Sequence, residues 1–166
     1  MLDGLALDSV LEVGCNRGHN LQAIRALREP PAVRGIEPMY FARRIAHENG
    51  LDVRDGTVYE IPYEDGMFDL AFTCGVLIHV PPDSLHAAIL ELARVSRRYV
   101  LAVEYPAEQD QEVPYRGLTG MLWKRDYGAH YRETVPESRL VSKGDLGASW
   151  DDARWWLLEK MSDKSG

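Results

Sequence analysis

The sequence has few cysteines and no long apolar segment. Its two cysteines, Cys15 and Cys74, have no partnered spacing and no nearby histidine pair. This argues against a structural zinc site and favours a reducing compartment. No run of 18 apolar residues occurs, so no membrane span is predicted, and the first ten residues lack the basic start and apolar core of a signal peptide. We therefore expect a cytoplasmic protein with no membrane partner.

Acidic residues outnumber basic ones, 26 to 19, and several catalytic motifs are absent. The formal net charge is −7, and an acidic surface repels phosphate backbones, so no nucleic-acid partner is expected. No cluster of Asp, Glu or His has spacing that suggests a catalytic metal. A Walker-type GK[ST] ending and a GxSxG elbow are both absent. These absences disfavour nucleotide hydrolysis, metal catalysis and serine-hydrolase chemistry.

What the sequence does contain is an alternation of short apolar runs with helical patterns. A chain of 166 residues is enough for one domain and too short for two, so residues 1–166 are interpreted as a single domain. Alternation of this kind predicts parallel strands and right-handed crossovers, hence a doubly wound α/β sheet. The predicted strands are residues 9–13, 33–37, 51–54, 68–73, 99–103, 139–143 and 154–159.

Three helices are predicted between these strands. The first has an apolar face that reaches Leu27 and ends at Pro30. The second covers residues 39–49, with Phe41 and Ile45 among its inward positions. The third covers residues 83–95, with Asp83 as its N-cap.

The last third of the chain is less regular. Residues 105–119 form a polar, proline-containing stretch that we interpret as a functional loop. The tandem Trp155-Trp156 is expected in the core. Five later residues form either a further polar site or a solvated face: Lys124, Arg125, Asp126, His130 and Tyr131.

The strongest chemical signal follows the first strand. Gly14 allows the backbone to turn sharply and lets a ligand approach, because it has no Cβ. Asn16 tolerates a left-handed conformation, and Gly18 allows the next helix to pack close to the strand. Glu37 ends the second strand about 20 residues later, where a carboxylate can accept hydrogen bonds from both ribose hydroxyls of a nucleoside cofactor.

The identity of that cofactor follows from two details of the loop. A nicotinamide cofactor usually requires three glycines at GxGxxG spacing, whereas here Asn16 and His19 occupy the second and third positions. Glu12 precedes the first glycine by two residues. Its carboxylate suits the positive amino group of a methionine moiety and would repel a pyrophosphate. S-adenosylmethionine is therefore favoured over NAD.

These residues resemble the class I methyltransferase superfamily over residues 9–103. VLEVGCNRG is similar to its first motif, GIEP to its ribose acid, EIPYEDGMFDLAF to its third and fourth strands, and CGVLIHVPPD to the stretch beneath the cofactor. The resemblance implies a Rossmann-like, mostly parallel seven-stranded sheet of order 3-2-1-4-5-7-6. It also implies helices before the first strand, which are missing here, since only eight residues precede Ser9. Either the start is truncated or the loop after Tyr105 covers the cofactor.

A narrower resemblance, to the pseudaminic acid biosynthesis-associated methyltransferases of bacteria, runs to the C-terminus through VPYRG, LWKRDYG and RWWLLEK. Residue by residue, the superfamily resemblance implies S-adenosylmethionine contacts from the first loop, the ribose acid, the third-strand loop and the end of the fourth strand. Thr57 and Val58 stand where many members have an acid against the adenine, which weakens that contact. The implied cofactor residues are Glu12, Gly14, Cys15, Asn16, Gly18, Glu37, Pro38, Met39, Thr57, Val58, Cys74, Gly75 and Val76.

Candidate catalytic residues follow the fourth and fifth strands. His79 is either a general base or a structural residue beneath the cofactor. Glu104 and Tyr105 end the fifth strand at the ligand-binding edge. With Tyr115 and Arg116 they form either an acceptor pocket, in which Arg116 suits a carboxylate or phosphate, or a loop anchored by its own salt bridges.

Together these inferences predict an enzyme that moves a methyl group from S-adenosylmethionine, leaving S-adenosylhomocysteine. The acceptor is expected to be an O or N atom of a small polar metabolite such as a sugar, amino acid or natural-product intermediate. The alternative is a degenerate, non-catalytic module of the same fold that binds the cofactor or a partner. The oligomeric state is not predicted.

Overall fold

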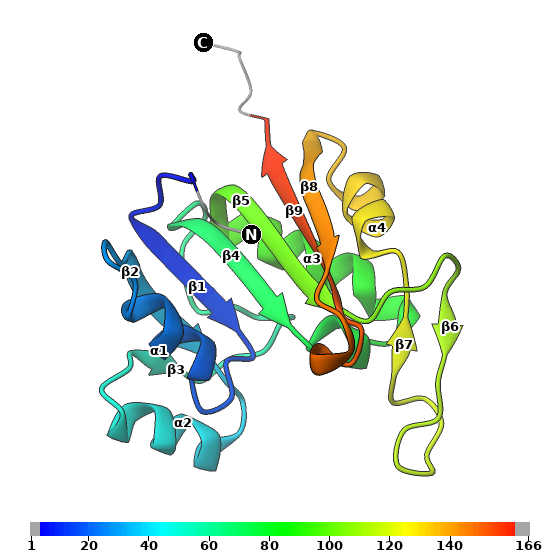
Figure 1. The fold of residues 1–166 in the computed structure, drawn as a ribbon, viewed down its shortest axis with the longest axis horizontal. Helices are drawn as coiled ribbons and strands as arrows, with labels where there is room; N and C mark the ends of the chain where they lie inside the picture. Colours follow the sequence, from blue (N-terminus) through cyan, green and yellow to red (C-terminus); the bar gives the residue numbers. More distant parts are fainter. Residues whose placement is uncertain (1–3, 162–166) are drawn as a thin grey trace.

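A computed structural model describes residues 4–161, and its centre is a seven-stranded sheet (Figure 1). The strand order is β3-β2-β1-β4-β5-β9-β8. Two further strands, β6 (Gln111–Glu112) and β7 (Trp123–Lys124), pair outside this sheet, so the predicted order 3-2-1-4-5-7-6 is confirmed. The strands of the sheet are β1 (Ser9–Val13), β2 (Ala32–Ile36), β3 (Val53–Arg54), β4 (Phe68–Cys74), β5 (Ser96–Glu104), β8 (Ser138–Asp145) and β9 (Arg154–Lys160).

The first five strands are parallel and the last two are antiparallel. The core strands read as nearly continuous apolar runs because both faces of the sheet are covered there. All seven predicted strands are present: residues 9–13 match β1 at both ends, and the ends of the other strands differ by at most three residues. The carboxyl ends of β1, β2 and β4 consequently meet at one edge, where open α/β sheets place their ligands.

Helices cover both faces of the sheet. On one face, α3 (Pro82–Val95) packs with α4 (Tyr127–Thr134) against β4, β5, β8 and β9. On the other face, α1 (His19–Arg25) contacts β2, and α2 (Tyr40–Glu48) contacts β3. Figure 1 shows α3 behind the sheet and α1 in front of β1 and β2.

Three details of the predicted helices are wrong. The first helix ends at Arg25, so Leu27 lies outside it and is 53% exposed. Phe41 is 66% exposed on α2, because the inward face of this short helix is filled by Ala42 and Ala46. Asp83 makes no capping bond: α3 begins at Pro82, whose missing N–H needs no partner at this position, so Asp83 only adds a negative charge to the first turn.

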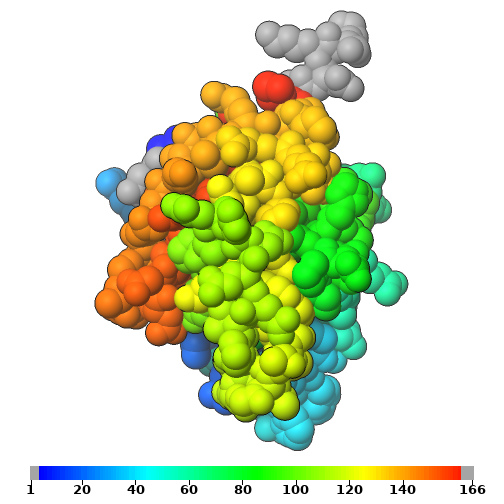
Figure 2. Space-filling view, turned by 90° about the vertical axis from the view of Figure 1, so that its right-hand side faces the viewer, coloured from blue at the N-terminus to red at the C-terminus, as the bar shows by residue number. Residues whose placement is uncertain are grey.

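The last third contains elements that the sequence pattern did not reveal. Residues 105–126, here called the strap, include β6 and β7 and lead into α4, which was not predicted. Two backbone hydrogen bonds close the base of the strap: the Ala107 amide donates to the Arg125 carbonyl, and the Arg125 amide donates to the Tyr105 carbonyl. Figure 2 shows the strap, in yellow-green, lying over one side of the molecule between α3 and the segment that joins β8 to β9.

The predicted tandem tryptophan divides between two environments on β9. Trp156 is 1% exposed and packs edge-on against Tyr127 of α4, at 5.7 Å between ring centroids. Trp155 is half-buried on the opposite face. Between β8 and β9 a short 3₁₀ turn, η2 (Ala148–Trp150), carries Trp150 to the ligand edge of the sheet. Among the described residues, no helix combines the length and apolarity needed to cross a bilayer.

Candidate active site

The loop between β1 and α1 has the conformation that the sequence predicted. Gly14 has φ +75° and Asn16 has φ +50°, both in the left-handed region. A Cβ on Gly14 would lie 2.6 Å from Cγ2 of Val76, so the loop and the turn after β4 approach closely. The amides of Gly14 and Cys15 both donate to the Ile36 carbonyl, which ties the loop to the end of β2.

Glu37 lies at the end of β2 and is 8% exposed. Its Oε2 accepts from the Asn16 amide and its Oε1 accepts from the Met39 amide, both at 2.9 Å. The carboxylate therefore connects the glycine loop to the start of α2. Since each carboxylate oxygen can accept a second hydrogen bond, Glu37 can also receive two hydroxyl groups from a ligand.

Glu12 is the most unusual group in the site. It is 2% exposed, its Oε1 accepts from the Asn20 side chain at 2.7 Å, and its Oε2 has no partner. Burial raises the pKa of Glu12 to about 8, the bond from Asn20 opposes the shift, and the nearby charge of Glu37 adds to it. A buried oxygen without a donor is costly, so this position fits a cationic group supplied by a ligand.

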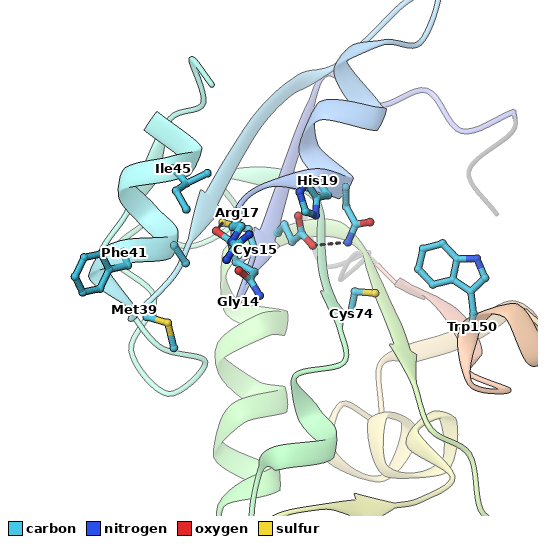
Figure 3. A pocket seen from close by; sticks show the side chains of 13 residues that line it. Gly14, Cys15, Arg17, His19, Met39, Phe41, Ile45, Cys74 and Trp150 are labelled. Atoms are coloured by element: carbon cyan, nitrogen blue, oxygen red, sulfur yellow. Dashed lines mark hydrogen bonds between the residues drawn. The ribbon is translucent and has the colours of Figure 1, made fainter. Parts of the chain in front are cut away.

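Two cavities share this edge of the sheet. The first, of about 600 Å³, lies between the glycine loop and α2. Figure 3 shows Phe41 and Ile45 of α2, with Met39 just before this helix, on one side and Cys74 and Trp150 on the other. The second, of about 710 Å³, lies beyond Glu37 and is bordered by the strap. Both cavities are lined by Gly14, Asn16, Met39 and Cys74.

The two cavities bring together twelve of the thirteen predicted cofactor residues. Six line the first cavity: Glu12, Gly14, Cys15, Asn16, Met39 and Cys74. The second adds Glu37, Pro38, Thr57, Val58, Gly75 and Val76. Gly18 lines neither. It is the N-cap of α1, with φ +80°, and a Cβ there would lie 2.1 Å from a methyl group of Leu51, so its role is close packing.

Of the five residues predicted for catalysis and acceptor binding, three line the second cavity: His79, Tyr115 and Arg116. His79 Nδ1 lies 2.7 Å from the Met121 carbonyl, and its ring packs edge-on against Tyr115. A carbonyl can only accept, so Nδ1 carries the proton in the neutral ring and Nε2 keeps a free lone pair.

Glu104 and Tyr105 do not line these two cavities, which removes the geometric basis for predicting them as catalytic. Glu104 is fully buried and accepts from the amides of Val76, Leu77 and Ile78. Burial raises its pKa to about 7, against these backbone donors. The Tyr105 hydroxyl donates to Asp151 at 3.1 Å.

The two cysteines are thiols. Burial raises the pKa of Cys15 to about 12 and that of Cys74 to about 11, and nearby carboxylates add to both shifts. A thiolate is the reactive form of cysteine, so neither side chain is prepared to act as a nucleophile. Their position in the first cavity instead provides an apolar, uncharged wall.

Sequence reasoning missed several residues of the site. Asn20 is the second residue of α1 and could have been found from its place directly after the glycine loop, but Trp150 arrives from the distant β8–β9 connection and gave no signal. Phe41 was assigned to the core and is instead a wall of the first cavity. The missed residues are Arg17, His19, Asn20, Phe41, Ala42, Ile45, Gly56, Tyr59, Val80 and Trp150.

A third, apolar cavity of about 350 Å³ adjoins the first at Asn20, Cys74 and Trp150. Its remaining walls are aliphatic or aromatic, with Phe72 and Leu101 among them. It offers few hydrogen-bonding groups, so a polar acceptor finds more partners in the second cavity. Within residues 4–161, no group of three or more His, Cys, Asp or Glu could hold a metal ion.

Comparison with known proteins agrees with this geometry. Residues 11–101, more than half of the chain, match the family model described as a methyltransferase domain. The chain therefore belongs to the methyltransferase domain family, and the predicted superfamily and enzyme class are confirmed. Among curated proteins, none matches the sequence.

Solved structures show the same fold at low sequence identity. The 1,6-didemethyltoxoflavin-N1-methyltransferase of Burkholderia thailandensis, with 1,6-didemethyltoxoflavin and S-adenosylhomocysteine bound, is 14% identical with a TM-score of 0.76. The alignment covers 95% of this chain and 72% of that one. A methyltransferase of Methanosarcina mazei that depends on S-adenosylmethionine is 15% identical, with a TM-score of 0.73 and coverage of 93% and 92%. The magnesium protoporphyrin IX methyltransferase of Synechocystis, with S-adenosylmethionine bound, is 14% identical, with a TM-score of 0.68 and coverage of 91% and 69%.

Proposed function

We propose that the chain binds S-adenosylmethionine across the first two cavities and transfers its methyl group to an O or N atom of a small polar metabolite. The observation that carries the proposal is the pair of carboxylates beside the glycine loop, one on β1 and one directly after β2. Glu12 presents an unpartnered oxygen to the first cavity, where it would receive the ammonium of the methionine moiety. Glu37 borders the second cavity and would receive the ribose hydroxyls.

When bound, S-adenosylmethionine supplies a sulfonium methyl: the acceptor's lone pair forms the new bond to carbon, the carbon–sulfur bond breaks, and its electrons stay on sulfur. The protein's contribution is alignment of the two reactants and exclusion of water. Tyr115 and Arg116 would hold a polar acceptor in the second cavity, and Arg116 suits a carboxylate or phosphate. The free Nε2 of His79 would take the proton that the acceptor loses.

The finer sequence predictions belong to this proposal. The resemblance to pseudaminic acid-associated methyltransferases supports a role in bacterial small-molecule biosynthesis, with a sugar, an amino acid or a natural-product intermediate as the acceptor. A cytoplasmic location and a single domain over residues 1–166 remain predictions, as does the absence of a nucleic-acid partner.

Calorimetric titration with S-adenosylhomocysteine and with adenosine, with NAD as a control, tests the cofactor assignment. Glu37→Gln should weaken both of the first two ligands by about 2 kcal/mol, or roughly 30-fold, because one acceptor of ribose hydrogen bonds becomes a donor. Glu12→Gln should weaken only S-adenosylhomocysteine, because adenosine lacks the amino-acid moiety and its ammonium group. Glu64→Gln, on an exposed loop, is the matched control. Equal loss of both ligands in the Glu12 variant would contradict the ammonium assignment.

His79→Ala tests the base. Once an acceptor is found by screening, turnover should fall about 100-fold or more, while affinity for S-adenosylhomocysteine stays within twofold. Turnover equal to that of the wild type would return His79 to a structural role. Tight cofactor binding with no turnover on any acceptor would instead favour the non-catalytic module.

A further inference from the structure

Two buried side chains form hydrogen bonds to the backbone of the turn that follows β4. It begins at Gly75, contains the 3₁₀ turn η1 (Leu77–His79), and presents Val76 and His79 to the second cavity. Glu104 accepts from three successive amides of this turn, at 3.1 to 3.3 Å. These donors would otherwise lack partners, because a short 3₁₀ turn satisfies few of its own N–H groups.

The carbonyl side of the same turn is held by Arg125. Its Nη1 donates to the Leu77 carbonyl at 3.2 Å and its Nη2 donates to the Val80 carbonyl at 3.0 Å. The guanidinium is 0% exposed and lies near the rings of Trp123 and Tyr127, with centroids 5.3 and 6.0 Å away. Arg125 is thus neither a solvated surface residue nor a lining residue of the second cavity, so for this residue neither of the two predicted alternatives holds.

Arg125 also joins this turn to the strap. Its backbone closes the base of the strap, and its Nε lies 3.3 Å from an oxygen of Asp110, whose other oxygen is 2.8 Å from His130 of α4. The strap in turn carries Tyr115 and Arg116 to the second cavity. One buried side chain therefore connects two walls of that cavity that are distant in sequence.

We propose that Arg125 is a positioning residue: with Glu104, it fixes the turn at residues 75–80 relative to the strap, and so sets the shape of the cavity that receives the adenosine and the acceptor. This inference rests on the proposed function for its ligand. The rigid placement of the turn can be measured without any ligand. An arginine suits this role because its planar fork reaches two carbonyls at once, which a lysine ammonium does less well.

The test compares Arg125→Met with Lys160→Met. Lys160 is a matched control because its Nζ also donates to two backbone carbonyls, those of Ala93 and Ser96, at the far end of α3. The first readout is hydrogen exchange of the peptide that covers residues 74–81 in the ligand-free protein. We expect exchange there to rise at least tenfold in the Arg125 variant and to stay unchanged in the Lys160 variant.

The second readout is affinity for S-adenosylhomocysteine, compared at equal folded fraction. We expect a loss of about tenfold in Arg125→Met, partial recovery in Arg125→Lys, and less than a twofold change in Lys160→Met. Wild-type protein that binds no S-adenosylhomocysteine would refute the proposed function, while the exchange data would still decide the role of Arg125. Unchanged exchange and affinity in Arg125→Met would overturn the inference.

If Arg125→Met does not fold, Glu104→Gln tests the hydrogen bonds that Glu104 accepts from the amides of the turn. The added amide nitrogen would face backbone N–H groups, so the same peptide should exchange faster with little change in side-chain volume. Protection equal to that of the wild type in this variant would also count against the proposal.

Discussion

The pH dependence of cofactor binding is the sharpest consequence of the buried Glu12. With a pKa of about 8 in the free protein, its carboxylate is ionised in about one molecule in ten at pH 7 and about one in a hundred at pH 6. If only the ionised form accepts an ammonium, apparent affinity scales with that fraction. The dissociation constant for S-adenosylhomocysteine should therefore fall about tenfold between pH 6 and pH 7.

Calorimetry offers a second measure of the same event. Binding at pH 7 should release about 0.9 proton, because nearly all Glu12 carboxyls must ionise. Titrations in two buffers of different ionisation enthalpy give this number directly. Glu12→Gln should abolish both the proton release and the pH dependence, and adenosine should show neither with the wild type. Proton release below about 0.2 in the wild type, with affinity constant from pH 6 to pH 7, would refute the reasoning.

Three further outcomes follow from the site. Burial raises the folded-state pKa of Glu12 above its ordinary value. The wild type should therefore lose stability relative to Glu12→Gln as the pH rises from about 4.5 to 8, by a few kcal/mol at most in denaturant unfolding. Unfolding free energies that change with pH in the same way for both proteins would contradict the shift. Gly14→Ala should destabilise the fold by about 1–3 kcal/mol, because of its positive φ and the contact of the new methyl group with Val76. Gly117→Ala is the control, since Gly117 has a similar φ of +80° and no neighbour within 4 Å. Equal losses of stability in the two variants would mean that the contact with Val76 costs nothing. Alkylation of Cys74 by iodoacetamide at pH 8, followed by peptide mass spectrometry, should be roughly 100-fold slower than that of an exposed thiol. Alkylation as fast as that of free glutathione would contradict the raised pKa.

The sequence predicted the sheet well because parallel core strands are apolar and short. Residues 9–13 form β1 as predicted, and the ligand edge follows from the positions of Gly14 and Glu37. The positive φ of Asn16 was also predicted, since few other residues adopt it readily.

The errors arose where periodicity does not decide burial. Phe41 has the helical spacing of a core residue, yet α2 is too peripheral to bury it, so it forms a cavity wall. The β6–β7 pair was missed because each strand has only two residues, and α4 was missed because its eight residues carry only two large buried side chains, Tyr127 and Tyr131. The role of Arg125 was missed because no local pattern distinguishes a fully buried arginine from a solvated one.

Trp150 has a consequence for the order of events during synthesis. It reaches the first cavity from the connection between β8 and β9, whereas the glycine loop lies more than 130 residues earlier in the chain and leaves the ribosome before it. Domains fold as their segments emerge, yet this cavity lacks one wall until β9 has emerged to pair with β5. Cofactor capture therefore depends on the β8–β9 hairpin: a nascent protein halted before that hairpin would hold both carboxylates and still leave the first cavity open on that side.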